Sequence, residues 1–235
     1  MWFYQVHTPI KAPKELVQKN GGNAYLAMLE SMDAAIGKVL DKLEDTGNLE
    51  NTIVVFYSDN GGDKSTTWLA EKKGSLLEGG LRVPMVVSWP QVIKGGTSTN
   101  EPITSMDFFP TFVHAAGGST QETKQLEGFD LMPIFQGEEK LEREFLYWHY
   151  PHNRKGVKYN MGGVILDRDW KLYNGYGVKP DALFNLKNDS MEKENLIQSH
   201  PQIAARMLKE HESWLERVNA TKPDYSNLTE DLSNF

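Results

Sequence analysis

The chain has 235 residues, enough for one large domain or for a medium domain with a smaller one appended. Its formal net charge is −7, and Lys and Arg do not cluster in runs, which excludes the basic footprint of a nucleic-acid-binding protein. The absence of Cys excludes disulfides, thiolate metal sites and a cysteine nucleophile, and no apolar run approaches the roughly 18 residues that a membrane span needs.

The chain opens on a short apolar run over residues 1–6, which meets His7-Thr8-Pro9 directly. This run lacks a basic region and is too short for a signal peptide, so we expect a buried strand. A chain that starts inside an element of structure is expected to be a fragment, or to begin at an internal Met.

Residues 14–20 predict a short helix, and residues 24–45 predict a longer amphipathic one whose apolar side chains recur every three or four positions. Residues 52–58 form a continuous β-branched and aromatic run, which is typical of a strand buried on both faces. A second buried strand is predicted over residues 83–89, and a short helix over residues 107–116. Helices that alternate with buried strands indicate an α/β layer architecture.

The pattern changes after about residue 139. Four short runs separated by turn residues predict a small antiparallel sheet, with a hairpin turn at residues 167–169; they cover residues 145–150, 163–167, 170–174 and 182–186. Residues 202–218 predict an amphipathic helix. We therefore expect an α/β domain over residues 1–139 and a smaller α+β domain, an antiparallel sheet plus a helix, over residues 140–235.

Asp59 and Asn60 follow the first predicted strand directly. Ligands of open α/β sheets collect beyond the carboxyl ends of strands, and carboxylate and amide oxygens are hard ligands suited to Ca²⁺ or Mg²⁺. The glycines after them let the backbone turn sharply, so both side chains can face one way. Asp-Asn-Gly-Gly is also ordinary turn chemistry, and a plain turn stays open as the alternative.

Lys73 and His7 are the two candidate anion contacts. Lys73 stands beside Gly74 and before a buried strand, where its ammonium can enter a cleft; the alternative is a solvated surface lysine. His7 stands where an apolar run ends, and it can donate a hydrogen bond to an anion or act as an acid. The alternative is a core histidine whose hydrogen bonds are satisfied by the protein.

Taken together, these segments resemble the sulfatase family over nearly the whole chain. The matching motifs occur in the family's order: Val6-His7-Thr8-Pro9, Met28-Leu29-Glu30-Ser31-Met32-Asp33, Tyr57-Ser58-Asp59-Asn60-Gly61-Gly62, Lys73-Gly74, Glu78-Gly79-Gly80-Leu81-Arg82-Val83-Pro84, Ser105-Met106-Asp107-Phe108-Phe109-Pro110-Thr111 and Asp169-Trp170-Lys171-Leu172-Tyr173. The resemblance implies the carboxyl-terminal half of an alkaline-phosphatase-like sandwich with a smaller carboxyl-terminal domain.

The resemblance also implies roles for the candidate residues. Asp59 and Asn60 match the family's ligands of a divalent cation, usually Ca²⁺, and Lys73 matches the lysine that contacts the sulfate. His7 matches the histidine that contacts the sulfate and protonates the leaving oxygen. These groups suit a sulfate ester, whose hydrolysis builds charge on the bridging and peripheral oxygens.

One departure from the family is large. Sulfatases form a formylglycine nucleophile from a Cys/Ser-x-Pro/Ala-x-Arg motif, and the 235 residues contain neither that motif nor the family's amino-terminal paired aspartates. We expect both upstream of residue 1. Because Ca²⁺ takes about six to eight oxygen ligands, the isolated chain is expected to bind metal weakly and to leave sulfate esters intact. Turnover of an aryl sulfate by the pure chain would contradict that expectation.

Three further residues are candidate substrate contacts. His149 and His152 lie among aromatic residues that could stack on a sugar ring; the alternative is a strand edge packed with aromatics. Arg82 is a candidate anion contact, and the alternative is an ion pair with a nearby carboxylate.

The sequence therefore predicts a sulfuric ester hydrolase that acts on sulfated carbohydrates or aryl sulfates in its full-length form. The rivals are a phosphodiesterase or phosphonate monoester hydrolase of the same superfamily, and a non-catalytic module that binds sulfated glycans. An incomplete sheet would expose an edge, so we expect self-association or a complementing amino-terminal half. The family expectation is a periplasmic or secreted protein, although the 235 residues assign no compartment.

Overall fold

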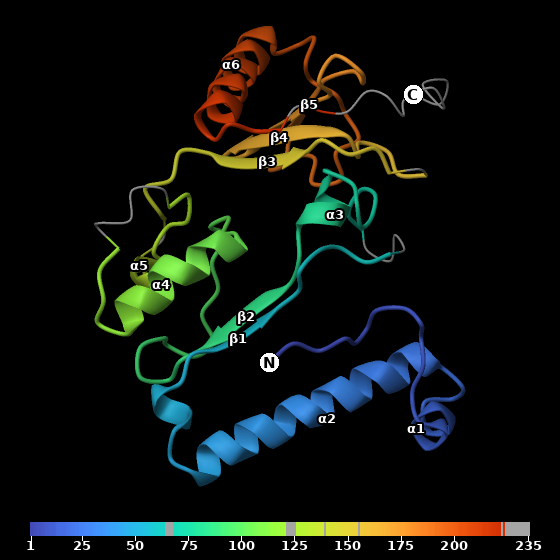
Figure 1. The fold of residues 1–235 in the computed structure, drawn as a ribbon, viewed down its shortest axis with the longest axis vertical. Helices are drawn as coiled ribbons and strands as arrows, with labels where there is room; N and C mark the ends of the chain where they lie inside the picture. Colours follow the sequence, from blue (N-terminus) through green and yellow to red (C-terminus); the bar gives the residue numbers. More distant parts are fainter. Residues whose placement is uncertain (64–67, 121–125, 139, 155, 222, 224–235) are drawn as a thin grey trace. The chain divides into compact units, whose positions relative to one another are not determined.

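The computed structural model describes residues 1–63, 68–120, 126–138, 140–154, 156–221 and 223 (Figure 1). The chain forms two compact units, each described separately. The first unit comprises Met1–Val54 and Val87–Thr97, and the second comprises Val55–Val86 and Ser98–Phe235. The division at residues 139 and 140 inferred from the sequence stays a prediction.

The first unit is built on two helices. The helix α1 (Lys14–Lys19) packs against α2 (Ala24–Asp45), and both lie where the sequence predicts them. The Asn23 side chain caps α2 by accepting hydrogen bonds from the backbone N–H groups of Tyr25 and Leu26, which satisfies two donors that the first helical turn leaves open. A short 3₁₀ helix, η1 (Leu49–Asn51), follows.

The buried strand predicted over residues 1–6 is wrong. These residues form no strand, and the side chain of Trp2 is fully exposed. An apolar run specifies a strand only when a neighbouring strand supplies its hydrogen bonds, and no strand pairs with these residues within the part of the chain that the structure describes.

A two-stranded sheet joins β1 (Val54–Tyr57) to β2 (Met85–Ser88). Both strands are confirmed, but their predicted burial on both faces is wrong. Phe56 is 43% exposed and Val86 is 63% exposed. In a sheet of two strands the alternate side chains face outward, so an apolar composition alone does not place a covering layer over them.

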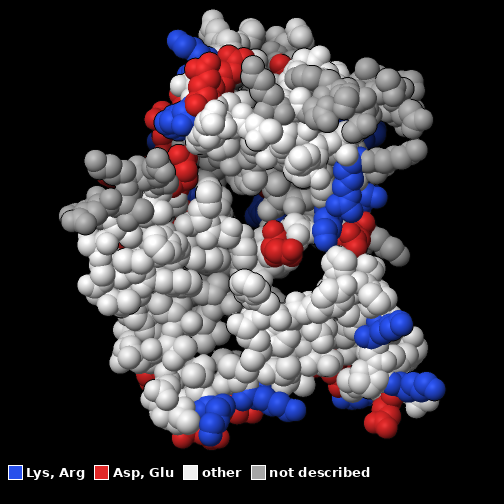
Figure 2. Space-filling model, viewed as in Figure 1, with Lys and Arg blue, Asp and Glu red and all other residues white. Residues whose placement is uncertain are grey.

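Along the chain, three short helices and one turn of 3₁₀ helix occur after β1 and before the second sheet. They are α3 (Glu78–Leu81), η2 (Ser105–Asp107), α4 (Phe108–Ala115) and α5 (Met132–Phe135). The helix predicted over residues 107–116 is confirmed as α4. On the face shown in Figure 2, the surface over α4 and α5 carries few charged side chains, and Phe109 and Phe112 are both exposed.

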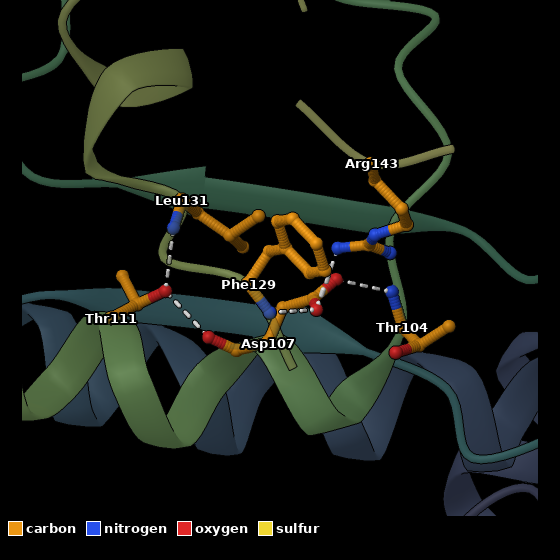
Figure 3. Close-up of polar contacts among 6 residues, drawn as sticks. All are labelled: Thr104, Asp107, Thr111, Phe129, Leu131 and Arg143. Atoms are coloured by element: carbon orange, nitrogen blue, oxygen red, sulfur yellow. Dashed lines mark hydrogen bonds and ion pairs between the residues drawn. The ribbon is translucent and has the colours of Figure 1, made fainter. Parts of the chain in front are cut away.

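A buried ion pair ties α4 to the segment before the second sheet. Asp107, which is fully buried, accepts hydrogen bonds from the backbone N–H groups of Thr104 and Phe129 and from Arg143 Nη2, which lies 2.7 Å away (Figure 3). The hydroxyl of Thr111 donates to the Asp107 carbonyl and accepts from the backbone N–H of Leu131 (Figure 3). The aspartate of the Ser-Met-Asp motif therefore has a structural function in this fold.

The second sheet is an antiparallel meander in the order β3-β4-β5-β6. Its strands are β3 (Leu146–Tyr150), β4 (Gly162–Asp167), β5 (Trp170–Asn174) and β6 (Ala182–Asn185), and each confirms a predicted strand. Asp167 pairs with Trp170, so the predicted hairpin turn is also confirmed. The helix predicted near the carboxyl end is α6 (Pro201–Arg217).

Strand alternation gives this sheet two covered faces. Ile165, Leu172 and Leu183 point to one face and pack against Ala204 and Met207 of α6. The opposite face, which carries Val164, Tyr173 and Phe184, packs against Leu76 and Leu77. The second contact fixes the segment that also carries Lys73, one of the candidate site residues.

Candidate active site

The Asp59-Asn60 pair lies at the end of β1, as predicted. The two side chains face one another, with Asn60 Nδ2 donating to Asp59 Oδ2 at 2.6 Å. The Ser58 hydroxyl donates to the Asn60 carbonyl at 3.1 Å, which holds the turn. Asp59 is exposed and Asn60 is half-buried, so a carboxylate and an amide are presented together at the surface.

Backbone hydrogen bonds place Lys73 beside this pair. The N–H of Lys73 donates to the Gly62 carbonyl at 2.9 Å, and the N–H of Gly61 donates to the Gly80 carbonyl at 3.0 Å. The turn after β1 therefore lies between the two ends of the segment from Lys73 to Gly80. The structure brings together three of the predicted site residues, Asp59, Asn60 and Lys73.

Close approach of these backbones requires glycine. A Cβ atom on Gly61 would lie 1.9 Å from the Gly79 carbonyl oxygen, and one on Gly79 would lie 2.3 Å from the Ala70 carbonyl oxygen. Gly74 has a φ of +90°, a conformation that side-chain-bearing residues rarely adopt. The glycines in both motifs thus allow the backbone of the turn after β1 to pack closely against the segment from Lys73 to Gly80.

Two buried charged residues, Lys171 and Glu192, contact the half-buried Glu78 of the Lys73 segment. Lys171 Nζ lies 2.9 Å from Glu78 Oε1 and forms an ion pair with Glu192 Oε1 at 2.8 Å. Glu192 also accepts a hydrogen bond from the Glu78 N–H at 2.6 Å. Burial raises the pKa of Glu192, and the ammonium of Lys171 opposes that rise. The side chain of Lys171 is only 1% exposed, so the charges of this triad act on one another with little solvent screening.

Glu192 is a residue that sequence reasoning misses. Its partner Glu78 is 114 positions away in the chain, and no local pattern connects them. Lys171 does carry a signal: it stands within an apolar strand, at the alternate position that Tyr173 shares, and so points toward the Leu76-Leu77 face.

His7 belongs to the first unit. It is exposed, its Nδ1 lies 2.8 Å from the Thr8 carbonyl oxygen, and its ring lies 5.3 Å from that of Tyr4. Its role as an acid stays a prediction.

The three predicted substrate contacts differ in their surroundings. Arg82 is exposed, its guanidinium lies 5.8 Å from the ring of Trp68, and no described carboxylate lies within 4.0 Å of it, so the alternative of an ion pair is not seen among these residues. His149 contacts the hydroxyl of Tyr176 through Nδ1 and the Thr221 carbonyl through Nε2. His152 is exposed and packs edge-on against Tyr150. Substrate binding by these three residues stays a prediction.

Two negative findings apply to the described residues alone. No three His, Asp or Glu side chains among them gather as a metal-binding group. None of the helices in the described ranges combines the length and apolar character needed to cross a bilayer.

Two family profiles match the chain, and both include the segment from Lys73 to Gly80. The profile of the family described as Sulfatase matches residues 1–119, and that of N-sulphoglucosamine sulphohydrolase, C-terminal, matches residues 68–219. The chain belongs to the sulfatase family.

Curated sulfatases match most of the chain. A sulfatase of Formosa agariphila is 31% identical over 93% of the chain and 46% of its own length. Human steryl-sulfatase is 31% identical over 94% of the chain and 44% of its own length. The sulfatase chain therefore spans less than half the length of these curated relatives.

The chain is similar in structure to solved proteins of the alkaline-phosphatase-like fold. The crystal structure of Ps i-CgsB has a TM-score of 0.77 and 30% identity, covering 90% of this chain and 48% of that one. Its complex with k-i-k-neocarrahexaose gives the same TM-score with 32% identity, covering 89% of this chain and 48% of the other. The predicted fold class is confirmed.

Proposed function

We propose that the protein to which this chain belongs is a sulfuric ester hydrolase, in which Asp59, Asn60 and Lys73 form one wall of the active site. The observation that carries the proposal is the pair of backbone hydrogen bonds joining the turn after β1 to Lys73 and Gly80. These bonds keep a carboxylate and an amide close to a lysine. A hard cation held by the first two and an ammonium from the third would both stabilise the charge that develops on a sulfate ester.

The Asp59-Asn60 pair fits part of a Ca²⁺ site. Carboxylate and amide oxygens are ligands that Ca²⁺ prefers, and the two side chains already touch. Two side chains supply only part of the six to eight oxygens that Ca²⁺ takes. When bound, the cation would neutralise charge on the sulfate oxygens. The chain's own contribution is to place Asp59 and Asn60 at a turn whose glycines fix its path.

Lys73 and His7 are proposed to act on the ester itself. The Lys73 ammonium binds a peripheral sulfate oxygen as a compact point charge, and the segment is fixed by Leu76 and Leu77 in the core. His7 donates a proton from a ring nitrogen to the leaving alcohol oxygen as the bond from that oxygen to sulfur breaks and the attacking nucleophile forms a new bond to the same sulfur. His149, His152 and Arg82 remain proposed contacts to the rest of the substrate.

The proposed substrate class is a sulfated carbohydrate. The match to the N-sulphoglucosamine sulphohydrolase profile and the similarity to Ps i-CgsB, solved with k-i-k-neocarrahexaose, support it. Steryl-sulfatase and the arylsulfatases among the relatives keep an aryl sulfate as the alternative.

The test is turnover of paired esters by the full-length protein. We expect hydrolysis of sulfate esters, with kcat/KM for p-nitrophenyl sulfate and for a sulfated disaccharide well above that for p-nitrophenyl phosphate. A phosphonate monoester hydrolase from Silicibacter pomeroyi shares the fold, with a TM-score of 0.63 at 19% identity, so the fold alone does not separate the two reactions. Faster turnover of phosphate or phosphonate esters would overturn the proposal.

A further inference from the structure

The segment that connects β3 to β4 lies against Lys73-Gly74. The N–H of Leu76 donates to the Tyr159 carbonyl at 2.8 Å, and the Tyr159 ring packs edge-on against Tyr173 and Phe184 in the core. The connecting segment is therefore anchored to both the Lys73 segment and the second sheet.

Arg154 of this connecting segment crosses directly over Gly74. A Cβ atom on Gly74 would lie 2.6 Å from Arg154 Cδ and 2.9 Å from its Nη1, so the guanidinium occupies the space above a glycine that follows Lys73 in sequence. Any side chain at residue 74 would displace the arginine. Glycine at this position thus permits the positive φ of the turn and also leaves room for the Arg154 side chain.

A buried asparagine holds the backbone of Arg154 in place. Asn160 is 1% exposed, and its Nδ2 donates to the Arg154 carbonyl and, at 3.1 Å, to Asn153 Oδ1. Its Oδ1 accepts from the Met161 N–H at 2.7 Å and from the ammonium of Lys179. The backbone that carries the exposed Arg154 is thus held by hydrogen bonds from a buried side chain.

The guanidinium of Arg154 has no anionic partner of its own among the described residues. It is exposed, and none of the described carboxylates lies within 4.0 Å of it, whereas Arg143 and Arg206 each pair with an aspartate. Arginine presents a planar fork of donors that matches sulfate and carboxylate groups. Arg154 is thus a cation beside the Lys73-Gly74 segment that is open to an anion the described residues do not supply.

We propose that Arg154 binds a second anionic group of the substrate, so that the site selects sugars carrying another sulfate or a carboxylate near the scissile sulfate. This inference rests on the proposed sulfatase function. Lys73 contacts the sulfate that is removed, and Arg154 contacts the group that stays.

The experiment compares three disaccharides of one backbone with the full-length protein: monosulfated, disulfated, and monosulfated with a uronic acid carboxylate. We expect wild-type kcat/KM to be about 10-fold or more higher for at least one doubly charged sugar than for the monosulfated one, the size expected of a charge-assisted hydrogen bond. Arg154→Gln removes this preference and leaves monosulfated turnover unchanged. Arg154→Lys retains part of it, because lysine keeps the charge without the fork.

The matched control is Arg168→Gln, which removes an exposed arginine from the turn at the other end of β4. It should leave all three values unchanged. Equal losses on all three sugars for Arg154→Gln, or no loss on any, would overturn the inference while sulfatase activity stands. Absence of turnover by the wild-type protein on every sulfate ester would instead overturn the proposed function.

Discussion

At the scale of single residues, burial decides what the polar groups of this chain can do. Asp107 is fully buried yet accepts hydrogen bonds from two backbone N–H groups and from Arg143. His211 is also fully buried, but its ring lies among Tyr176, Trp214 and Asn174, with no carboxylate in hydrogen-bond contact among the described residues. Hydrogen bonds and a counter-charge therefore compensate the burial of Asp107, whereas burial favours the neutral form of the His211 ring.

Replacing Asp107 by Asn should strongly destabilise the fold. The amide leaves Arg143 buried without a counter-charge, and it turns an N–H₂ group toward backbone donors, so we expect a loss of about 3–5 kcal/mol in the free energy of unfolding. Urea unfolding of the protein measures this loss. Asp169→Asn, at an exposed turn position, is the control and should change the value by less than about 0.5 kcal/mol. Comparable effects of the two substitutions would contradict the structural role of Asp107.

His211 should make stability depend on pH. Burial lowers the pKa of His211 to about 4, against 6.5 ordinarily, so the unfolded chain binds the proton more tightly. The free energy of unfolding that the buried neutral His211 contributes is fully present above pH 6.5 and is lost as the pH falls toward 4. From pH 7.5 to pH 5 we expect a loss of about 2 kcal/mol that His211→Gln abolishes. Urea midpoints at the two pH values test this, with the exposed His152→Gln as control; an unchanged pH dependence in His211→Gln would refute it.

At the scale of elements, the segment from Lys73 to Gly80 depends on partners far away in the chain. Its apolar residues pack on the second sheet, and its Glu78 joins the buried triad with Lys171 and Glu192. A lysine of β5 thus contacts the Lys73 segment, which lies beside the turn after β1. We expect the triad to act on the site through the position of this segment.

Lys171→Met should therefore weaken both the fold and the site. Two buried carboxylates lose their cation, which should cost about 3–5 kcal/mol in the free energy of unfolding. Adding Glu192→Gln to this variant removes one uncompensated charge and should recover a measurable part of the loss. The exposed Lys187→Met is the control. Strictly additive losses in the double variant, measured by urea unfolding, would show that the two residues are not coupled.

Most elements of this fold are readable from the sequence, because their patterns are local. The 3.6-residue periodicity places α2 within the observed bounds, and the turn residues separate β3, β4, β5 and β6. What the pattern misses is set by distant partners. Residues 1–6 form no strand, and Phe56 in β1 is exposed despite its apolar neighbours.

At the scale of the whole molecule, the candidate site combines a local part and a long-range part. Asp59, Asn60 and Lys73 are recognisable because each stands in a short motif beside glycines. The contacts from Glu192 and Arg154 are not recognisable, because only the folded sheet brings them to the Lys73 segment. The chain spans less than half the length of its curated relatives, and its activity is accordingly proposed for the protein as a whole.

The central claim is that Asp59 and Lys73 belong to one active site. The most direct test is the kcat/KM of the full-length protein for a sulfate ester after substitution of each residue. Asp59→Asn and Lys73→Met should each lower kcat/KM by about 100-fold or more, the size expected when a group that stabilises developing charge is removed. Lys187→Met, an exposed lysine of the second unit, should leave it unchanged. Wild-type turnover in both site variants would contradict the assignment of Asp59 and Lys73 to one active site.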